Sequence, residues 1–280
     1  MKLLRYGPAG LEKPGCLHTD GTVRDLSSVV ADISSSTLSP EMLESIASHD
    51  IGALPVVENP GRIGSCVGHP GKMVCIGLNY SDHAAETGAT PPGQPIIFHK
   101  AVTALCGPND DVEKPRNAEA LDWEVELAIV IGEKAKYVSE ADAMNYVAGF
   151  ALFNDVSERD FQTKREGQWT KGKSHDTFGP LGPWLVTKDE VSDVHNLAMW
   201  LDVNGERRQT GSTSTLIFNV PTIVSYLSQF MTLLPGDVIP TGTPPGVGMG
   251  MKPPQYLNVG DVMTLGIEGL GEQRQTVVAA

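Results

Sequence analysis

The segment from Leu121 to Glu133, LDWEVELAIVIGE, places the strongest constraint on how this chain can fold. Its second half, Leu127 to Ile131, is wholly apolar, which is typical of a buried strand. Its first half carries Asp122, Glu124 and Glu126 at alternate positions, and alternate residues of a strand lie on one face. The fold therefore has to accommodate a row of carboxylates beside its own core.

Short apolar runs recur after residue 70, and Gly and Pro residues separate them. They include PIIFHK, AGFALFNDV, NLAMWLDVNGE and DVMTLGIEG. Helical patterns are fewer, and they predict helices over 40–47, 139–147 and 221–230. This mixture favours an α+β, mainly β fold over a doubly wound parallel sheet.

The N-terminal part of the chain differs in character from the rest. Residues 1–70 alternate short apolar runs with turns and hold no cluster of reactive side chains. We therefore predict a small N-terminal domain over 1–70 and a larger domain over 71–280 that holds the candidate functional residues.

Charge and cysteine content argue against several classes of function. The formal net charge is −13, whereas nucleic acids and anionic membranes require a basic surface. No apolar run approaches the length of a membrane span, so a cytoplasmic location is expected. The cysteines, Cys16, Cys66, Cys75 and Cys106, show no CxxC spacing, so neither a zinc site nor a redox pair is indicated.

The row of carboxylates has two interpretations. Acids on one face of a strand most often form a solvated edge. However, a second apolar strand, AGFALFND, ends at Asp155 and offers a further carboxylate. Carboxylates packed in a partly dry cleft repel one another, and a divalent cation relieves that repulsion. Oxygen ligands of this kind favour magnesium, manganese or calcium over zinc.

A second group of candidates lies in the segment NYSDHAAETG. His83 and Glu86 are spaced i and i+3, so on a helix they share a face. The carboxylate could then orient the imidazole as a general base. The alternative is an exposed helix that carries polar residues without a catalytic role.

The segment GQWTKGKS matches the phosphate-loop pattern GxxxxGK[ST], but its flanks do not form the strand and helix that such a loop needs. Nucleotide binding is therefore not predicted. Lys173 in this segment could neutralise a substrate carboxylate or a developing oxyanion, or it could be a surface lysine. The later loop PTGTPPGVGMG, with Thr241 and Thr243, could be a plain connection or a rigid loop that faces a ligand.

Five segments in this order and spacing together resemble the fumarylacetoacetate hydrolase family: GLNYSDHAAETG, DWEVELAIVIG, NDVSERDFQ, KGKSHDTFGPLGPW and TGTPPGVGMG. The resemblance covers about residues 70 to 270. It implies a mixed β-sandwich roll with a small N-terminal α+β domain, assembled as a homodimer.

The resemblance also implies a metal site. Magnesium or manganese, with calcium as a further ion in crystals, would be held by Glu124, Glu126 and Asp155. Asp122 has no counterpart among the family's direct ligands. After the IF strand, Lys100 is followed by Ala101 where many relatives have Pro, so we carry no role over to that strand.

The remaining roles follow from the same motifs. The implied catalytic residues are His83, Glu86 and Lys173. The implied substrate-binding residues are Thr243, Arg159 and Gln162.

The activity that the resemblance implies is hydrolysis of a C–C bond in a small-molecule 2,4-diketo acid, which yields pyruvate and a second acid. The most similar family members act on 2,4-diketo-3-deoxy sugar acids of L-rhamnonate or L-fuconate pathways, and others act on acylpyruvates. Oxaloacetate decarboxylation and ureidoglycolate cleavage are the alternatives within the family. A non-enzymatic metal-binding module is disfavoured because the chain keeps all the expected reactive residue types together.

Overall fold

The structure is a computed structural model that describes residues 1–82 and 90–280. The predicted catalytic residues His83 and Glu86 lie outside the described residues.

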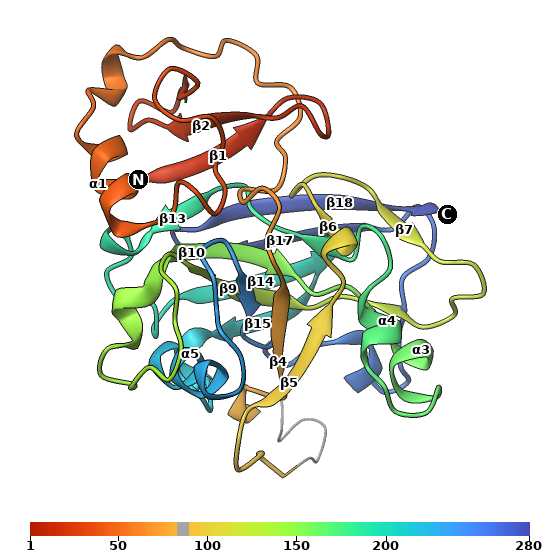
Figure 1. The fold of residues 1–280 in the computed structure, drawn as a ribbon. Helices are drawn as coiled ribbons and strands as arrows, with labels where there is room; N and C mark the ends of the chain where they lie inside the picture. Colours follow the sequence, from red (N-terminus) through yellow and green to blue (C-terminus); the bar gives the residue numbers. More distant parts are fainter. Residues whose placement is uncertain (83–89) are drawn as a thin grey trace.

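A large mixed sheet forms the centre of the part of the chain that is described (Figure 1). Its order is β3 (Val23–Asp25), β2 (Lys13–Leu17), β1 (Lys2–Tyr6), β13 (Leu185–Thr187), β10 (Val147–Asn154), β9 (Val125–Ile131), β16 (Val238–Pro240), β4 (Met73–Gly77) and β5 (Ile96–Lys100). Strands β9 and β10 are antiparallel and buried along their whole length, which agrees with their continuous apolar sequences. The pairing of β16 with β4 is parallel.

A second mixed sheet packs against the first. Its order is β15 (Glu206–Ser212), β14 (Ala198–Val203), β17 (Val262–Ile267), β18 (Gly271–Ala279) and β7 (Val112–Lys114). The two sheets are joined by buried amides: the Val125 N–H donates to Gln209 Oε1 at 3.0 Å, and Asn154 Nδ2 donates to Gln275 Oε1 at 3.0 Å. Two short ladders complete the strands, β6 (Leu105–Cys106) with β12 (Gly179–Pro180) and β8 (Leu121–Asp122) with β11 (Ser157–Glu158).

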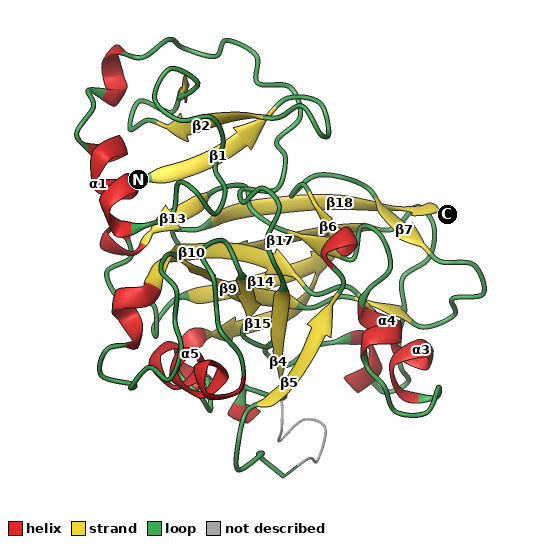
Figure 2. Cartoon of the chain, in the orientation of Figure 1, coloured by secondary structure: helices red, strands yellow, loops and turns green. Residues whose placement is uncertain are grey.

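Helices are few and lie at the periphery of the sheets (Figure 2). The α-helices with described bounds are α1 (Pro40–Ala47), α3 (Arg159–Thr163), α4 (Thr170–Lys173) and α5 (Val220–Phe230). Short 3-10 helices cover Ile51–Ala53, Val102–Ala104, Ala143–Tyr146, Lys188–Glu190, Thr213–Thr215 and Gly248–Gly250. The predicted helices over 40–47 and 221–230 are confirmed, and each begins after a side-chain cap.

The predicted helix over 139–147 is wrong. Only the 3-10 turn Ala143–Tyr146 forms there, and Val147 already belongs to β10, where it pairs with Ile131 of β9. Pairing within the buried sheet thus outweighs the local helical tendency of this segment.

The prediction of a mainly β fold with mixed sheets is confirmed. Strand β1 is hydrogen-bonded to β13, with Leu3 opposite Leu185, so the N-terminal strands extend the central sheet. The division of the chain near residue 70 stays a prediction. Among the described residues, no helix has the length and apolar character that a membrane crossing requires.

Candidate active site

Three carboxylates converge at one end of the β9–β10 pair. Glu124 precedes β9, Glu126 lies within it, and Asp155 follows β10, so the antiparallel register brings all three to the same end. One oxygen atom from each lies within 4.8 Å of the others. Their residues are only 7%, 2% and 0% exposed. The interpretation of this row as a solvated edge is therefore wrong.

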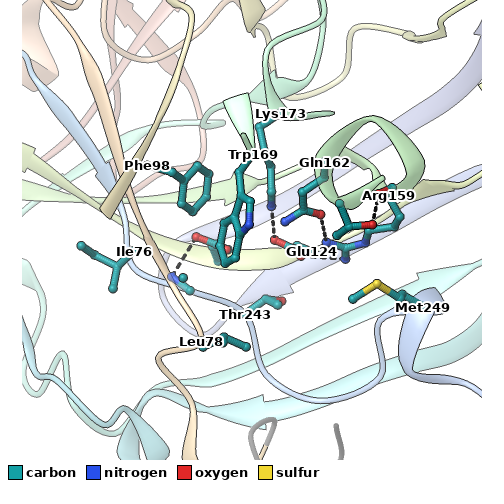
Figure 3. A pocket seen from close by; sticks show the side chains of 14 residues that line it. Ile76, Leu78, Phe98, Glu124, Arg159, Gln162, Trp169, Lys173, Thr243 and Met249 are labelled. Atoms are coloured by element: carbon teal, nitrogen blue, oxygen red, sulfur yellow. Dashed lines mark hydrogen bonds and ion pairs between the residues drawn. The ribbon is translucent and has the colours of Figure 1, made fainter. Parts of the chain in front are cut away.

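Two buried lysines contact these carboxylates. Lys173, at the end of α4, places its Nζ 2.8 Å from Glu124 Oε2 (Figure 3). The same Nζ lies 2.7 Å from Asp155 Oδ2. It is not a surface lysine, because only 2% of it is exposed. Lys100, at the end of β5, donates from Nζ to Asp155 Oδ1 at 2.5 Å and to the Val156 carbonyl at 3.1 Å. The sequence prediction assigned no role to Lys100. Its position at the end of an apolar strand could have indicated a lysine that enters the site.

Arg159, the first residue of α3, links the carboxylates to the surrounding loops. Its Nε donates to Asp122 Oδ2 at 2.8 Å, and its Nη2 lies 2.7 Å from Glu124 Oε1. Asp122 also accepts hydrogen bonds from the backbone N–H groups of Gly248 and Met249, at 2.7 and 3.0 Å. Asp122 therefore links Arg159 to the late glycine-rich loop, and its omission from the metal ligands stays a prediction.

Close packing of α3 against α4 brings Lys173 into the site. A Cβ at Gly172 would lie 2.3 Å from the Glu158 carbonyl and 2.4 Å from the Gln162 backbone nitrogen. No side chain fits in that space, so a glycine at position 172 allows the two helices to touch. The adjacent lysine then reaches the carboxylates of the central sheet.

The negative charges of Glu124 and Glu126 are not balanced equally by nearby positive charges. Burial alone would raise the pKa of Glu124, but the positive charges of Lys173 and Arg159 outweigh it and lower that pKa to about 2. Burial raises the pKa of Glu126 well above its ordinary value, and the negative charges of Asp155 and Glu124 raise it further. The Glu126 carboxylate accepts a 2.9 Å hydrogen bond from the Gly242 N–H. Within the described residues, no lysine or arginine forms an ion pair with it.

This arrangement fits a divalent cation. All three donors are carboxylates, and oxygens that share an ion at about 2.0–2.6 Å lie within about 5 Å of one another. The observed spacing of 4.8 Å or less satisfies that limit. A cation would also supply the positive charge that Glu126 lacks. The buried triad is thus able to bind a divalent metal.

A cavity of about 250 Å³ is lined by Glu124 and Glu126 of the triad, and Figure 3 shows its lining. The polar lining residues are Glu124, Glu126, Arg159, Gln162, Thr163, Lys173 and Thr243. The apolar lining residues are Ile76, Leu78, Phe98, Trp169 and Met249, with Gly77 and Gly242 between them. The apolar group was not predicted, because a single hydrophobic residue in the sequence carries no signal that distinguishes a cavity wall from the core.

Two predicted substrate-binding residues are held in defined orientations. Gln162 Oε1 accepts a 3.1 Å hydrogen bond from Arg159 Nη1, so its amide NH2 group is left for the cavity. That NH2 group has no hydrogen-bond partner among the residues described. Thr243 Oγ1 donates to the Val125 carbonyl at 2.9 Å and accepts from Gln209 Nε2 at 2.8 Å. The Thr243 hydroxyl therefore fastens its loop to β9, and its role in substrate binding stays a prediction.

The structure thus brings most of the predicted site residues to one cavity, which is lined by Glu124, Glu126, Lys173, Arg159, Gln162 and Thr243. Asp155 does not line the cavity, but it contacts Lys173 and completes the triad. Their individual roles in binding and catalysis remain predictions.

Comparison with known proteins identifies the family. The family model described as "Fumarylacetoacetate (FAA) hydrolase C-terminal" matches residues 72–278. The chain belongs to the fumarylacetoacetate hydrolase family. This chain is 56% identical to a Burkholderia multivorans protein that is named "Putative hydrolase". The match extends over 281 residues and covers 100% of both chains. The family resemblance in the sequence is confirmed at this level.

Solved structures of family members extend over the whole chain. The 2-hydroxyhepta-2,4-diene-1,7-dioate isomerase of Mycobacterium marinum is 34% identical, with a TM-score of 0.75 and coverage of 100% of this chain and 98% of that one. The maleylpyruvate hydrolase of Sphingobium sp. SYK-6, in complex with manganese(II) and pyruvate, is 28% identical, with a TM-score of 0.83 and full coverage of both chains. The chain is thus similar both to a hydrolase and to an isomerase of the family.

Proposed function

We propose that this protein is a divalent-metal-dependent hydrolase that cleaves the C3–C4 bond of 2,4-diketo acids and releases pyruvate and a second acid. The observation that carries this proposal is the convergence of Glu124, Glu126 and Asp155 beside Lys173, with Glu124, Glu126 and Lys173 lining one cavity. The manganese and pyruvate bound by the similar maleylpyruvate hydrolase support it.

In this proposal Glu124, Glu126 and Asp155 hold a magnesium or manganese ion. When bound, such an ion would act as a Lewis acid that stabilises negative charge on the pyruvate enolate as it leaves. The protein provides a buried, oxygen-rich site for the ion, and it keeps Glu124 ionised through the charges of Lys173 and Arg159.

The other residues would bind the acid and move protons. Lys173 keeps its positive charge, because the nearby Asp155 and Glu124 outweigh the effect of burial and raise its pKa. Its ammonium group is suited to bind the substrate carboxylate or the oxyanion that forms at C4. The NH2 group of Gln162 would donate to an oxygen of the same acid.

Hydrolysis also requires an activated water. We keep His83 as the general base and Glu86 as the residue that orients it. His83 would remove a proton as the water oxygen bonds to C4. The C3–C4 bond then breaks, its electron pair passes to pyruvate as the enolate, and the proton returns to C3.

A second candidate function is isomerisation of a 2-hydroxydienoate, which the similarity to the Mycobacterium marinum isomerase favours. Isomerisation moves a proton between carbons and consumes no water. Decarboxylation of oxaloacetate would use the same metal and lysine, and it would release carbon dioxide.

One assay separates these functions. Purified protein with Mg2+ is incubated with acetylpyruvate, the ultraviolet absorbance is followed, and pyruvate and acetate are quantified. We expect both products in equal amounts and a loss of turnover in His83→Ala. The control His49→Ala should keep full turnover, because His49 is exposed and does not line the cavity. The absence of pyruvate from every acylpyruvate tested would overturn the proposal. A 2-hydroxydienoate and oxaloacetate are offered in parallel. Conversion of the hydroxydienoate to its isomer would identify an isomerase, and carbon dioxide release from oxaloacetate that survives His83→Ala would identify a decarboxylase.

A further inference from the structure

We propose that the arm of the substrate, the part beyond its C4 carbonyl, is uncharged and apolar, and that Phe98, Trp169 and Leu78 select it. This inference rests on the proposed diketo-acid function and specifies its substrate class. It follows from how charge and apolar surface divide the cavity.

Three apolar residues of the lining lie together, whereas the apolar Met249 lies near Arg159 (Figure 3). In Figure 3, Ile76, Leu78 and Phe98 lie on one side of the cavity and Arg159 lies on the other. The indole of Trp169 projects between the two sides. An acid whose keto-acid end lies against the carboxylates and Lys173 must therefore extend its arm along the apolar side.

The aromatic part of this side is built into the fold. The rings of Trp169 and Phe98 are 5.4 Å apart, between centroids, at an interplanar angle of 59°. A Cβ at Gly77 would lie 2.6 Å from Trp169, so the indole occupies space that any larger residue would fill. Two rings in this arrangement form a rigid surface that suits a flat or branched apolar group.

Both cations of the lining are already paired with carboxylates of the protein. Arg159 contacts Asp122 and Glu124, at 2.8 and 2.7 Å, and Lys173 contacts Glu124 and Asp155. Among the described residues, no other lysine or arginine lines the cavity. A carboxylate at the end of the arm would thus be buried against apolar side chains without a partner, which is unfavourable.

The same side of the cavity offers little to a hydroxylated arm. Ile76, Leu78 and Phe98 provide no side-chain hydrogen-bond donors, and Trp169 provides only its indole N–H (Figure 3). Hydroxyl groups placed against them would lose their bonds to water without replacement. An acylpyruvate with an alkyl or aryl arm is therefore preferred over a dioate and over a 2,4-diketo-3-deoxy sugar acid.

The test compares unreactive 2-oxo acids that lack the scissile 1,3-dicarbonyl group. Binding of 4-phenyl-2-oxobutanoate, 2-oxohexanedioate and a hydroxylated 2-oxo-3-deoxy sugar acid to Mn2+-loaded protein is measured by isothermal titration calorimetry. We expect the phenyl compound to bind at least about tenfold more tightly than either of the others. Equal or tighter binding of the dioate or of the hydroxylated acid would overturn the inference.

A charge introduced on the apolar side provides a second test. Leu78 is partly exposed, so Leu78→Lys adds a cation at the cavity without burying it deeply. This variant is expected to strengthen dioate binding at least about fivefold, whereas the neutral control Leu78→Gln is not. An identical response of the two variants would show that charge does not decide the selection.

Turnover distinguishes this inference from the proposed function. Benzoylpyruvate and fumarylpyruvate are offered to the same protein with Mg2+. Cleavage that is faster for fumarylpyruvate would overturn the inference and leave the proposed function intact. Preferential binding of the phenyl acid without cleavage of either compound would support the inference and overturn the proposed function.

Discussion

Arg159 donates a hydrogen bond from Nη1 to Oε1 of Gln162 at 3.1 Å, and this contact sets the orientation of the Gln162 amide. An arginine can only donate, so the amide oxygen must face it and the NH2 group must face the cavity. The ion pair between Arg159 and Asp122 holds the arginine in turn. A substrate-facing donor is thereby oriented by groups that do not themselves have to touch the substrate.

Replacing Gln162 by leucine should weaken substrate binding. A hydrogen bond to a charged group contributes about 1.5–3 kcal/mol, so we expect kcat/KM to fall by about 10- to 100-fold, mainly through a higher KM. Gln168→Leu makes the same chemical change at an exposed position of the neighbouring loop and should leave both constants unchanged. Steady-state kinetics on an acylpyruvate would measure the difference. An unchanged KM in Gln162→Leu would remove this residue from the binding site.

Replacing Glu126 by glutamine should impair metal binding. The substitution keeps the shape of the side chain but removes the one carboxylate of the triad that has no lysine or arginine partner in the described structure. We expect the affinity for Mn2+ to fall at least about tenfold, as calorimetry would measure. Glu133→Gln, at an exposed position just beyond the end of β9, serves as the control. Equal affinities in the two variants would contradict the assignment of Glu126 as a ligand.

Glu12 should make the stability of the protein depend on pH. Burial alone would raise its pKa, but the hydrogen bond from Arg62 and the charge of Arg5 outweigh that effect and lower it from 4.5. Because the folded pKa lies below the unfolded one, the stabilisation is complete above the unfolded value and is lost as the pH falls through the folded value.

Glu12→Gln should therefore lower Tm at pH 7 by about 2–4 °C, which corresponds to about 1 kcal/mol. The difference from the wild type should shrink as the pH is lowered from about 5 to about 3. Thermal unfolding at several pH values would measure it, with the exposed Glu58→Gln as the control. A difference that stays constant over this range would show that the ionisation of Glu12 does not contribute.

Local patterns predicted those parts of the fold that depend on neighbouring residues. The apolar run Leu127 to Ile131 lies in the central strand β9, and α1 begins where Ser39 accepts a hydrogen bond from the Met42 N–H. The segment 139–147 shows the limit of this approach. Its end was incorporated into β10 because β9, which lies outside the segment, was available as a partner strand.

The candidate site shows the same division. Residue types and motif spacing identified Glu124, Glu126, Asp155 and Lys173 as candidates, because each lies in a short motif whose residue types indicate its chemistry. Contacts across the chain then established their surroundings: Lys173 meets Glu124, 49 positions away, and Asp155, 18 positions away. The buried Lys100 and the aromatic pair of Trp169 and Phe98 emerged only from packing. Periodicity and capping act between near neighbours, whereas ion pairing and cavity shape depend on distances through space that no spacing along the chain specifies.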